Sequence, residues 1–143
     1  MTRASQAPQV AYGDTNTLIA LLAGESHPLH QRALGLFRRV ADGELALVVT
    51  AIVVAELVYV TTATMGSSRQ VVGERLSALL QADGLVLPER PTVLRALELY
   101  ATGTRLDFAD AYLAAAALEV GPNVVASFDS DFDAIEGIRR IPA

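Results

Sequence analysis

Short apolar segments that suit β-strands alternate with longer segments of helical periodicity along almost the whole chain. Such an alternation predicts an α/β fold in which helices cover both faces of a parallel sheet. Residues 51–64 are rich in β-branched side chains, but their length favours a helix over a strand. The predicted strands are residues 9–13, 45–50, 85–87, 123–127 and 138–141, and the predicted helices are residues 15–23, 27–40, 51–64, 69–81, 91–102 and 107–120.

The length of 143 residues fits one domain with its own core, so we expect a single domain over residues 1–143. A hydrophobic share of 52% excludes a disordered chain. Residues 1–7 are polar, and we expect them to be frayed. The longest apolar run, residues 45–60, is interrupted by Thr50 and Glu56 and is shorter than the ~20 residues of a membrane span. We therefore expect a cytoplasmic protein with no membrane segment.

Missing residue types exclude several chemistries. The chain has no Cys, which excludes disulfides, thiolate metal sites and cysteine nucleophiles. All 11 basic residues are Arg, and the lack of Lys excludes the P-loop and Schiff-base chemistry. The formal net charge of −5 disfavours binding of nucleic acid over a broad surface. The two histidines, His27 and His30, either ligate a metal or begin a surface helix, and we favour the second interpretation.

Carboxylates stand at the ends of predicted strands or near the starts of the helices beside them. Because the carboxyl ends of parallel strands share one edge of a sheet, such side chains are expected to gather there. Glu56 lies in an apolar run, where a carboxylate is seldom buried without a partner. The acids concerned are Asp14, Glu56, Asp107, Asp110, Asp129 and Asp131.

Each acid also has a purely structural interpretation. Asp14 and Asp107 are suited to cap the helices that follow them. Asp129 and Asp131 are suited to an Asx-turn. Glu56 fits a narrow exposed stripe on its helix, and Asp110 fits a first-turn carboxylate that the helix dipole favours.

A shared site would need a cation, because carboxylates that are brought together repel and raise one another's pKa. Oxygen ligands without Cys select Mg²⁺ or Mn²⁺ over zinc. Mg²⁺ takes one or two carboxylates directly and keeps several waters, so this number of acids suits one or two ions. Such a site fits metal-assisted hydrolysis of phosphodiesters, in which the metal generates hydroxide from water near neutral pH.

Four segments that carry these acids occur in the order and spacing of a known family. They read DTNTLIALL at residues 14–22, VVAEL at 53–57, LDFADAYLAAA at 106–116 and VVASFDSDF at 124–132. In these segments the chain resembles PIN-domain ribonucleases, and most closely the VapC-type toxins of toxin–antitoxin pairs. Each motif alone is weak, but four in the right order are specific, and the likeness covers about residues 9–141.

The resemblance implies a PIN-like α/β/α sandwich with a parallel sheet of four or five strands. It also implies Mg²⁺- or Mn²⁺-dependent endonucleolytic cleavage of RNA. Asp14 and Asp110 would then be the primary metal ligands, and Glu56 would position the metal or its water. The fourth acid would be Asp129, with Asp131 as the alternative because the last motif of the family varies in spacing.

Further polar residues match supporting positions of the family. Asp107 would be an accessory acid or only a helix cap. Asn16 and Ser127 match positions that orient the metal ligands by hydrogen bonds. Ser127 stands where Thr is more usual in the family, a change that keeps the hydroxyl.

The family implies partners as well as chemistry. A cognate VapB-like antitoxin would lay an apolar segment across the first helices and send a basic side chain into the acidic site, and homodimers are common. One apolar stripe either belongs to the antitoxin-binding surface or packs in the core of the protein. We favour core packing for most of this stripe. It consists of Leu29, Ala33, Leu36, Phe37 and Val40.

Other functions fit parts of the sequence. A catalytically silent PIN-like module that binds RNA or a partner is the main alternative, although none of the expected acids is missing. A phosphoacceptor domain would also place Asp14 after the first strand, but it would need a Lys. The small size and the lack of extra basic helices disfavour a DNA-cleaving enzyme. The candidate phosphate contacts are Arg32, Arg38, Arg39, Arg69 and Arg105, and for each of them alone we favour a solvated helix face.

Overall fold

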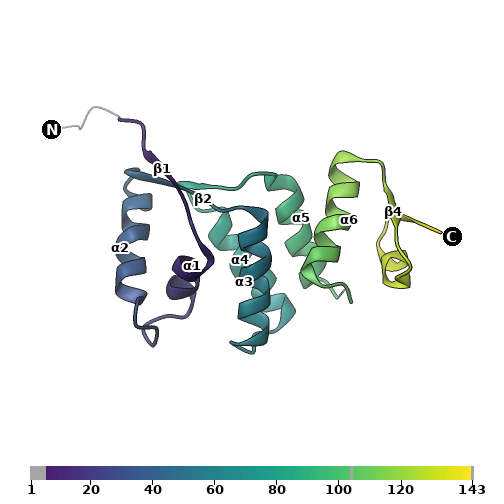
Figure 1. The fold of residues 1–143 in the computed structure, drawn as a ribbon, viewed down its shortest axis with the longest axis horizontal. Coiled ribbons are helices and arrows are strands. Elements are labelled where there is room, and N and C mark those ends of the chain that lie inside the picture. Colours follow the sequence, from purple (N-terminus) through teal and green to yellow (C-terminus); the bar gives the residue numbers. More distant parts are fainter. Residues whose placement is uncertain (1–5, 104, 143) are drawn as a thin grey trace. The chain divides into compact units, whose positions relative to one another are not determined.

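The computed structural model describes residues 6–103 and 105–142 (Figure 1). The predicted strands and helices are all present, with bounds that differ from the predicted ones by up to three residues. A short 3₁₀ helix at Ser130–Ala134, which the sequence did not predict, lies between the last two strands. The elements are β1 (Gln9–Tyr12), α1 (Thr15–Leu22), α2 (His30–Ala41), β2 (Leu45–Val48), α3 (Ala51–Ala63), α4 (Arg69–Leu80), β3 (Leu85–Val86), α5 (Arg90–Ala101), α6 (Phe108–Val120), β4 (Val124–Ala126) and β5 (Arg139–Ile141).

The chain divides into two compact units, which we describe separately. The first unit consists of Met1–Leu57 and Leu80–Pro88, and the second of Val58–Leu79 and Glu89–Ala143. The expectation of a single domain stays a prediction. The expected fraying of residues 1–7 falls mostly on residues outside the described part of the chain.

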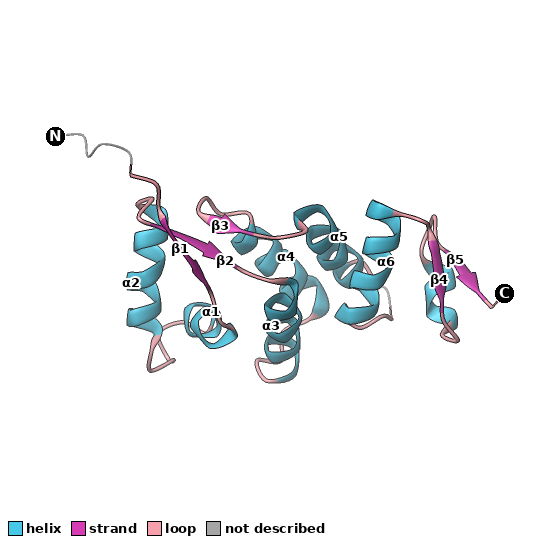
Figure 2. Cartoon of the chain, turned by 45° about the horizontal axis from the view of Figure 1, so that its top comes forward, coloured by secondary structure: helices cyan, strands magenta, loops and turns pink. Residues whose placement is uncertain are grey.

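The first unit contains a parallel sheet in the order β1-β2-β3 (Figure 2). All four residues of the central strand β2 are buried, as expected for a strand of a covered parallel sheet. Gly84, just before β3, has a φ of +87°, and a Cβ there would lie 2.6 Å from the side chain of Val40. Only glycine fits this approach of the strand to α2.

Most of the apolar stripe on α2 serves the core of the first unit. Ala33 and Val40 are buried and Leu36 and Phe37 are half-buried, whereas Leu29 is exposed. His30, the first residue of α2, is also buried, and its Nδ1 lies 2.8 Å from the carbonyl oxygen of Ala20 in α1. His30 is buried between α1 and α2, where this hydrogen bond joins the two helices. The interpretation of His30 as a surface residue is therefore wrong.

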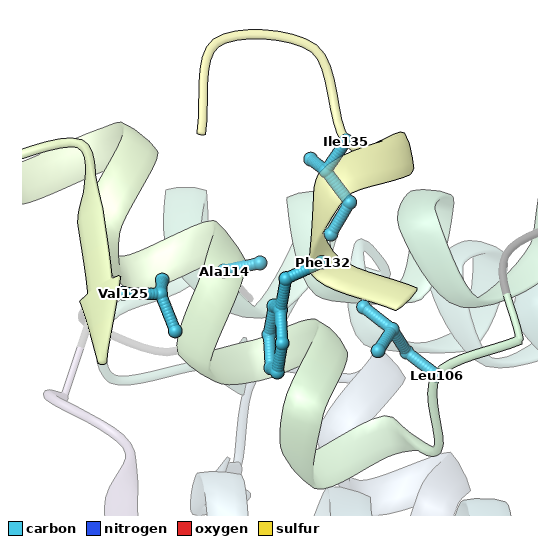
Figure 3. Close-up of a cluster of buried hydrophobic side chains, with 5 residues drawn as sticks. All are labelled: Leu106, Ala114, Val125, Phe132 and Ile135. Carbon is cyan, nitrogen blue, oxygen red and sulfur yellow. The ribbon is translucent and has the colours of Figure 1, made fainter. Parts of the chain in front are cut away.

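The second unit packs α6 against α5 and pairs β4 with β5 in parallel. Five buried side chains form its apolar cluster, in which the ring of Phe132 lies between Val125 and Leu106 (Figure 3). The other two members are Ala114 and Ile135. The cluster therefore attaches the 3₁₀ helix and β4 to α6.

Within residues 6–103 and 105–142, the strands are hydrogen-bonded in two sheets, one of three strands and one of two. The expected sheet of four or five strands is therefore not the pairing that the structure has. Apolar patterns identify strands but carry little information on which strands pair, and β3 and β4 are only two and three residues long. The α/β class with parallel strands is confirmed. Among the described helices, none has the length and apolar character needed to cross a membrane.

Candidate metal and active site

Asp14 is separated from the end of β1 by Gly13 and caps α1. Its Oδ1 accepts hydrogen bonds from the backbone N–H and the hydroxyl of Thr17, at 3.0 and 2.9 Å. These two bonds hold the pKa of Asp14 below its ordinary value of 3.8. The capping interpretation is therefore confirmed. It is compatible with metal binding, because both bonds end on the same oxygen of the carboxylate.

Glu56 lies on α3 and is exposed, as the structural interpretation of this residue expected. The hydroxyl of Thr15 donates to its Oε2 at 2.7 Å. Because Thr15 follows Asp14 in the chain, this bond brings the Glu56 carboxylate to the first turn of α1. Asn16 is exposed in the same turn. Sequence reasoning missed Thr15, which matches no catalytic pattern.

Asp107 and Asp110 stand at the start of α6 in the second unit. Asp107 caps this helix, and its Oδ1 accepts from the backbone N–H of Asp110 at 2.9 Å. Asp110 is half-buried, and burial raises its pKa above the ordinary value. The charges of Asp107 and Asp129 raise the pKa of Asp110 further, as does a side-chain hydrogen bond with Asp107. Asp107 is thus both a cap and a member of an acidic group.

Asp129 follows β4 in a tight turn. Its backbone N–H donates to the Ser127 hydroxyl at 3.0 Å, and its Oδ1 accepts from the backbone N–H of Asp131 at 2.8 Å. The predicted Asx-turn is therefore present, and Ser127 supports it. Asp131 is half-buried within the 3₁₀ helix. The charge of Asp129, and not that of Asp131, is among those that raise the pKa of Asp110.

A pair that the sequence analysis missed supports the same turn. The Arg140 guanidinium donates to both carboxylate oxygens of Asp133, at 2.9 and 3.0 Å, and to the carbonyl oxygen of Ser127 at 3.1 Å. The hydrogen bond with Asp133 raises the pKa of Arg140, and the same bond lowers the pKa of Asp133. Arg140 thus ties β5 to the segment that leads into Asp129.

The arginines that the sequence offered as phosphate contacts differ in their surroundings. Arg32, Arg38 and Arg39 are exposed on α2, and Arg105 is exposed before α6. Arg69 is half-buried and donates to the backbone carbonyls of Tyr100 and Leu106. The interpretation of Arg69 as a solvated residue is therefore wrong.

The candidate acids fall into two sets, one in each unit. In the described parts of the chain, no three His, Asp or Glu side chains converge closely enough to enclose a metal ion. The donor chemistry nevertheless fits a hard divalent cation, because every candidate ligand is a carboxylate. Burial is the main cause of the raised pKa of Asp110, and the charges of Asp107 and Asp129 add to it; a cation would offset this repulsion. The sets are Asp14 with Glu56 in the first unit, and Asp107, Asp110, Asp129 and Asp131 in the second.

The chain was also compared with known proteins. The PIN domain family matches residues 11–138, a span that includes all the candidate acids. No match was found among the curated proteins or among the solved structures. PIN domains are commonly nucleases that use divalent metal ions. Since the match covers most of the sequence, the chain belongs to the PIN domain family.

Proposed function

We propose that this PIN-domain protein is a Mg²⁺- or Mn²⁺-dependent endoribonuclease that hydrolyses RNA phosphodiester bonds. The observation that carries the proposal is the acidic group at the start of α6, where burial and then the charges of Asp107 and Asp129 raise the pKa of Asp110. Folding that places like charges together is costly, and functional sites are where proteins accept such a cost. Membership of a family of nucleases supports the same conclusion.

The proposed ligands are Asp14, Glu56, Asp110 and Asp129, with Asp14 and Asp110 as the primary ones. A bound divalent cation would lower the pKa of its water and stabilise charge on the phosphate. Two features of the chain support these roles. The cap bonds of Asp14 hold its carboxylate in place and lower its pKa, and the Thr15 hydroxyl orients Glu56.

Supporting residues complete the proposed site. Asp107 fixes the backbone of Asp110 through the cap bond, and Ser127 fixes that of Asp129. The charge of Asp129, and not that of Asp131, acts on Asp110, so Asp129 is the better candidate for the fourth acid. No such contact supports a role for Asn16, whose assignment rests on the family resemblance alone.

The test is RNA cleavage by the wild type and by Asp110→Asn, purified side by side, with Mg²⁺ or Mn²⁺ present. Asp83→Asn is a matched control, because it removes an exposed carboxylate of a turn outside the proposed site. We expect the wild type and the Asp83→Asn control to cleave RNA, and we expect EDTA to stop this cleavage. Asp110→Asn should not cleave RNA. Equal cleavage by all three proteins would indicate a contaminating nuclease and would give no support to the assignment of Asp110.

We further propose that the protein is the toxin of a toxin–antitoxin pair, with a VapB-like antitoxin as partner and a homodimer as its own assembly. The resemblance of the four acidic segments to VapC-type toxins supports this role. Its test is induced expression in a bacterial host, where the wild type is expected to arrest growth and Asp110→Asn is not. Growth arrest by neither protein, with both expressed and folded, would favour a catalytically silent module that binds RNA or a partner.

A further inference from the structure

Arg69, the first residue of α4, contacts two distant parts of the second unit through one guanidinium. Its Nε donates to the carbonyl oxygen of Tyr100 at 3.1 Å, and its Nη2 donates to the carbonyl oxygen of Leu106. The guanidinium carbon also lies 4.0 Å from the centre of the Tyr100 ring. One planar group therefore joins the last turn of α5 to the residue before Asp107.

The partners of Arg69 are themselves held in place. Tyr100 is buried, and its hydroxyl lies 3.0 Å from the Oγ1 of Thr62 on α3. Leu106 is 1% exposed and belongs to the apolar cluster of the second unit. The ring of Phe108 meets that of Tyr100 edge to face, with 6.5 Å between the ring centres. A displacement of Arg69 would therefore be transmitted to the start of α6.

The carbonyl that Arg69 holds lies one peptide before the proposed acidic group. Leu106 precedes Asp107, and the Asp107 carboxylate accepts from the backbone N–H of Asp110. The contact chain thus runs from Arg69 through Leu106 and Asp107 to Asp110. A planar guanidinium can bond two carbonyls and stack on a ring at once, which the ammonium group of a lysine cannot do.

We propose that Arg69 is a positioning residue, which holds the Leu106 carbonyl and so fixes where Asp107 and Asp110 present their carboxylates to a divalent cation. The inference rests on the proposed metal-dependent function. It replaces the earlier interpretation of Arg69 as a phosphate contact, because its guanidinium already binds two backbone carbonyls. A misplacement of about 1 Å in a catalytic group can lower activity by about 10²-fold, so such a role has measurable consequences.

The test uses Arg69→Lys, which keeps the charge but loses the planar fork. Cleavage is measured as a function of Mn²⁺ and of RNA concentration, and Mn²⁺ binding is measured without RNA by electron paramagnetic resonance. We expect the Mn²⁺ concentration for half-maximal binding and cleavage to rise about tenfold. The KM for RNA should stay within about twofold, since Arg69 does not touch the RNA in this account.

Arg95→Gln is the matched control. The Nη1 of Arg95 lies 2.9 Å from Oε1 of Glu119, so this change also removes an arginine that joins α5 to α6. Glu119 lies at the end of α6 that is far from Asp107 and Asp110. Its Mn²⁺ dependence should equal that of the wild type. Circular dichroism checks the fold of each variant, and Arg69→Gln, which can still donate one hydrogen bond, replaces Arg69→Lys if that protein does not fold.

The outcomes separate the inference from the function on which it rests. A higher KM for RNA and a weaker salt dependence, with unchanged Mn²⁺ binding, would overturn the inference and make Arg69 a phosphate contact. Unchanged Mn²⁺ dependence and unchanged KM would also overturn it. A wild type that neither binds Mn²⁺ nor cleaves RNA would overturn the proposed function and the inference together.

Discussion

Asp14 in the first unit and Asp110 in the second are both proposed metal ligands at the start of a helix. Their surroundings shift the pKa values of the two carboxyl groups in opposite directions. Asp14 receives two hydrogen bonds from Thr17, and these lower its pKa. Asp110 is half-buried and faces the charges of Asp107 and Asp129, and its pKa is raised. The first unit therefore stabilises an anion by itself, whereas the second accumulates negative charge that a cation would stabilise.

The largest effect should separate Asp129 from Asp131, which lie two residues apart. Asp129→Asn is expected to lower metal-dependent RNA cleavage by about 10²-fold, because it removes a proposed ligand beside Asp110. Asp131→Asn should cost less than about tenfold, because Asp131 is not among the charges that act on Asp110. The measurement is kcat/KM at saturating Mn²⁺. The reverse order of the two variants would assign the fourth acid to Asp131.

The next largest effect should appear at the hydrogen bond that supports Glu56. Thr15→Val removes the hydroxyl that donates to Oε2 and is expected to lower cleavage about tenfold. Thr15→Ser keeps a hydroxyl and should retain most of the activity. Cleavage rates of the two variants, measured together, check the prediction. Equal losses would show that the methyl group of Thr15, rather than its hydroxyl, matters.

Without metal, the two acids should affect stability with opposite signs. Asp14→Ala removes the cap of α1 and should lower the free energy of unfolding by about 1 kcal/mol, or the Tm by about 2–4 °C. Asp110→Asn removes a crowded charge and should raise the Tm by about 1–2 °C. Thermal unfolding in EDTA measures both. A Tm for Asp110→Asn below that of the wild type would mean that the charge is not unfavourable in the folded protein.

The smallest effect is the pH dependence of these stability differences. Because its pKa is lowered on folding, Asp14 stabilises the folded protein at pH values above 3.8, the ordinary pKa. This stabilisation is lost as the pH falls through the folded-state pKa of Asp14. Because its pKa is raised on folding, Asp110 contributes stability to the folded protein at pH values below 3.8. This stability is lost as the pH rises through the folded-state pKa of Asp110. At neutral pH, Asp14→Asn should therefore be less stable than the wild type and Asp110→Asn more stable. Both differences should shrink towards zero on acidification, as followed by thermal unfolding in EDTA across the acidic pH range.

The sequence predicted local features of the fold well. Helix and strand positions follow from apolar periodicity, and the caps at Asp14 and Asp107 follow from the residue types that accept bonds from a helix start. The Asx-turn at Asp129 is local in the same sense. Each of these features depends on residues within a few positions of one another, so the local residue types are enough to predict it.

Features that join distant segments were not predictable in the same way. Thr15 and Glu56 are 41 residues apart, and Arg69 and Leu106 are 37 apart. His30 is buried because its ring reaches Ala20, and Arg140 supports Ser127 across the β4–β5 pair. The division of five strands into two sheets is another such feature. In each case the outcome depends on which segments pack together, and the residue types alone do not state this.

The most direct test of the central claim is the effect of Mn²⁺ on thermal stability without RNA. The wild type and Asp83→Asn should both gain Tm as Mn²⁺ is added, by an amount equivalent to about 2.7 kcal/mol when Mn²⁺ exceeds its Kd a hundredfold. Asp110→Asn should start from a higher Tm in EDTA and gain little. Equal gains in all three proteins, or none in the wild type, would contradict the account in which the crowded acids at the start of α6 bind a divalent cation.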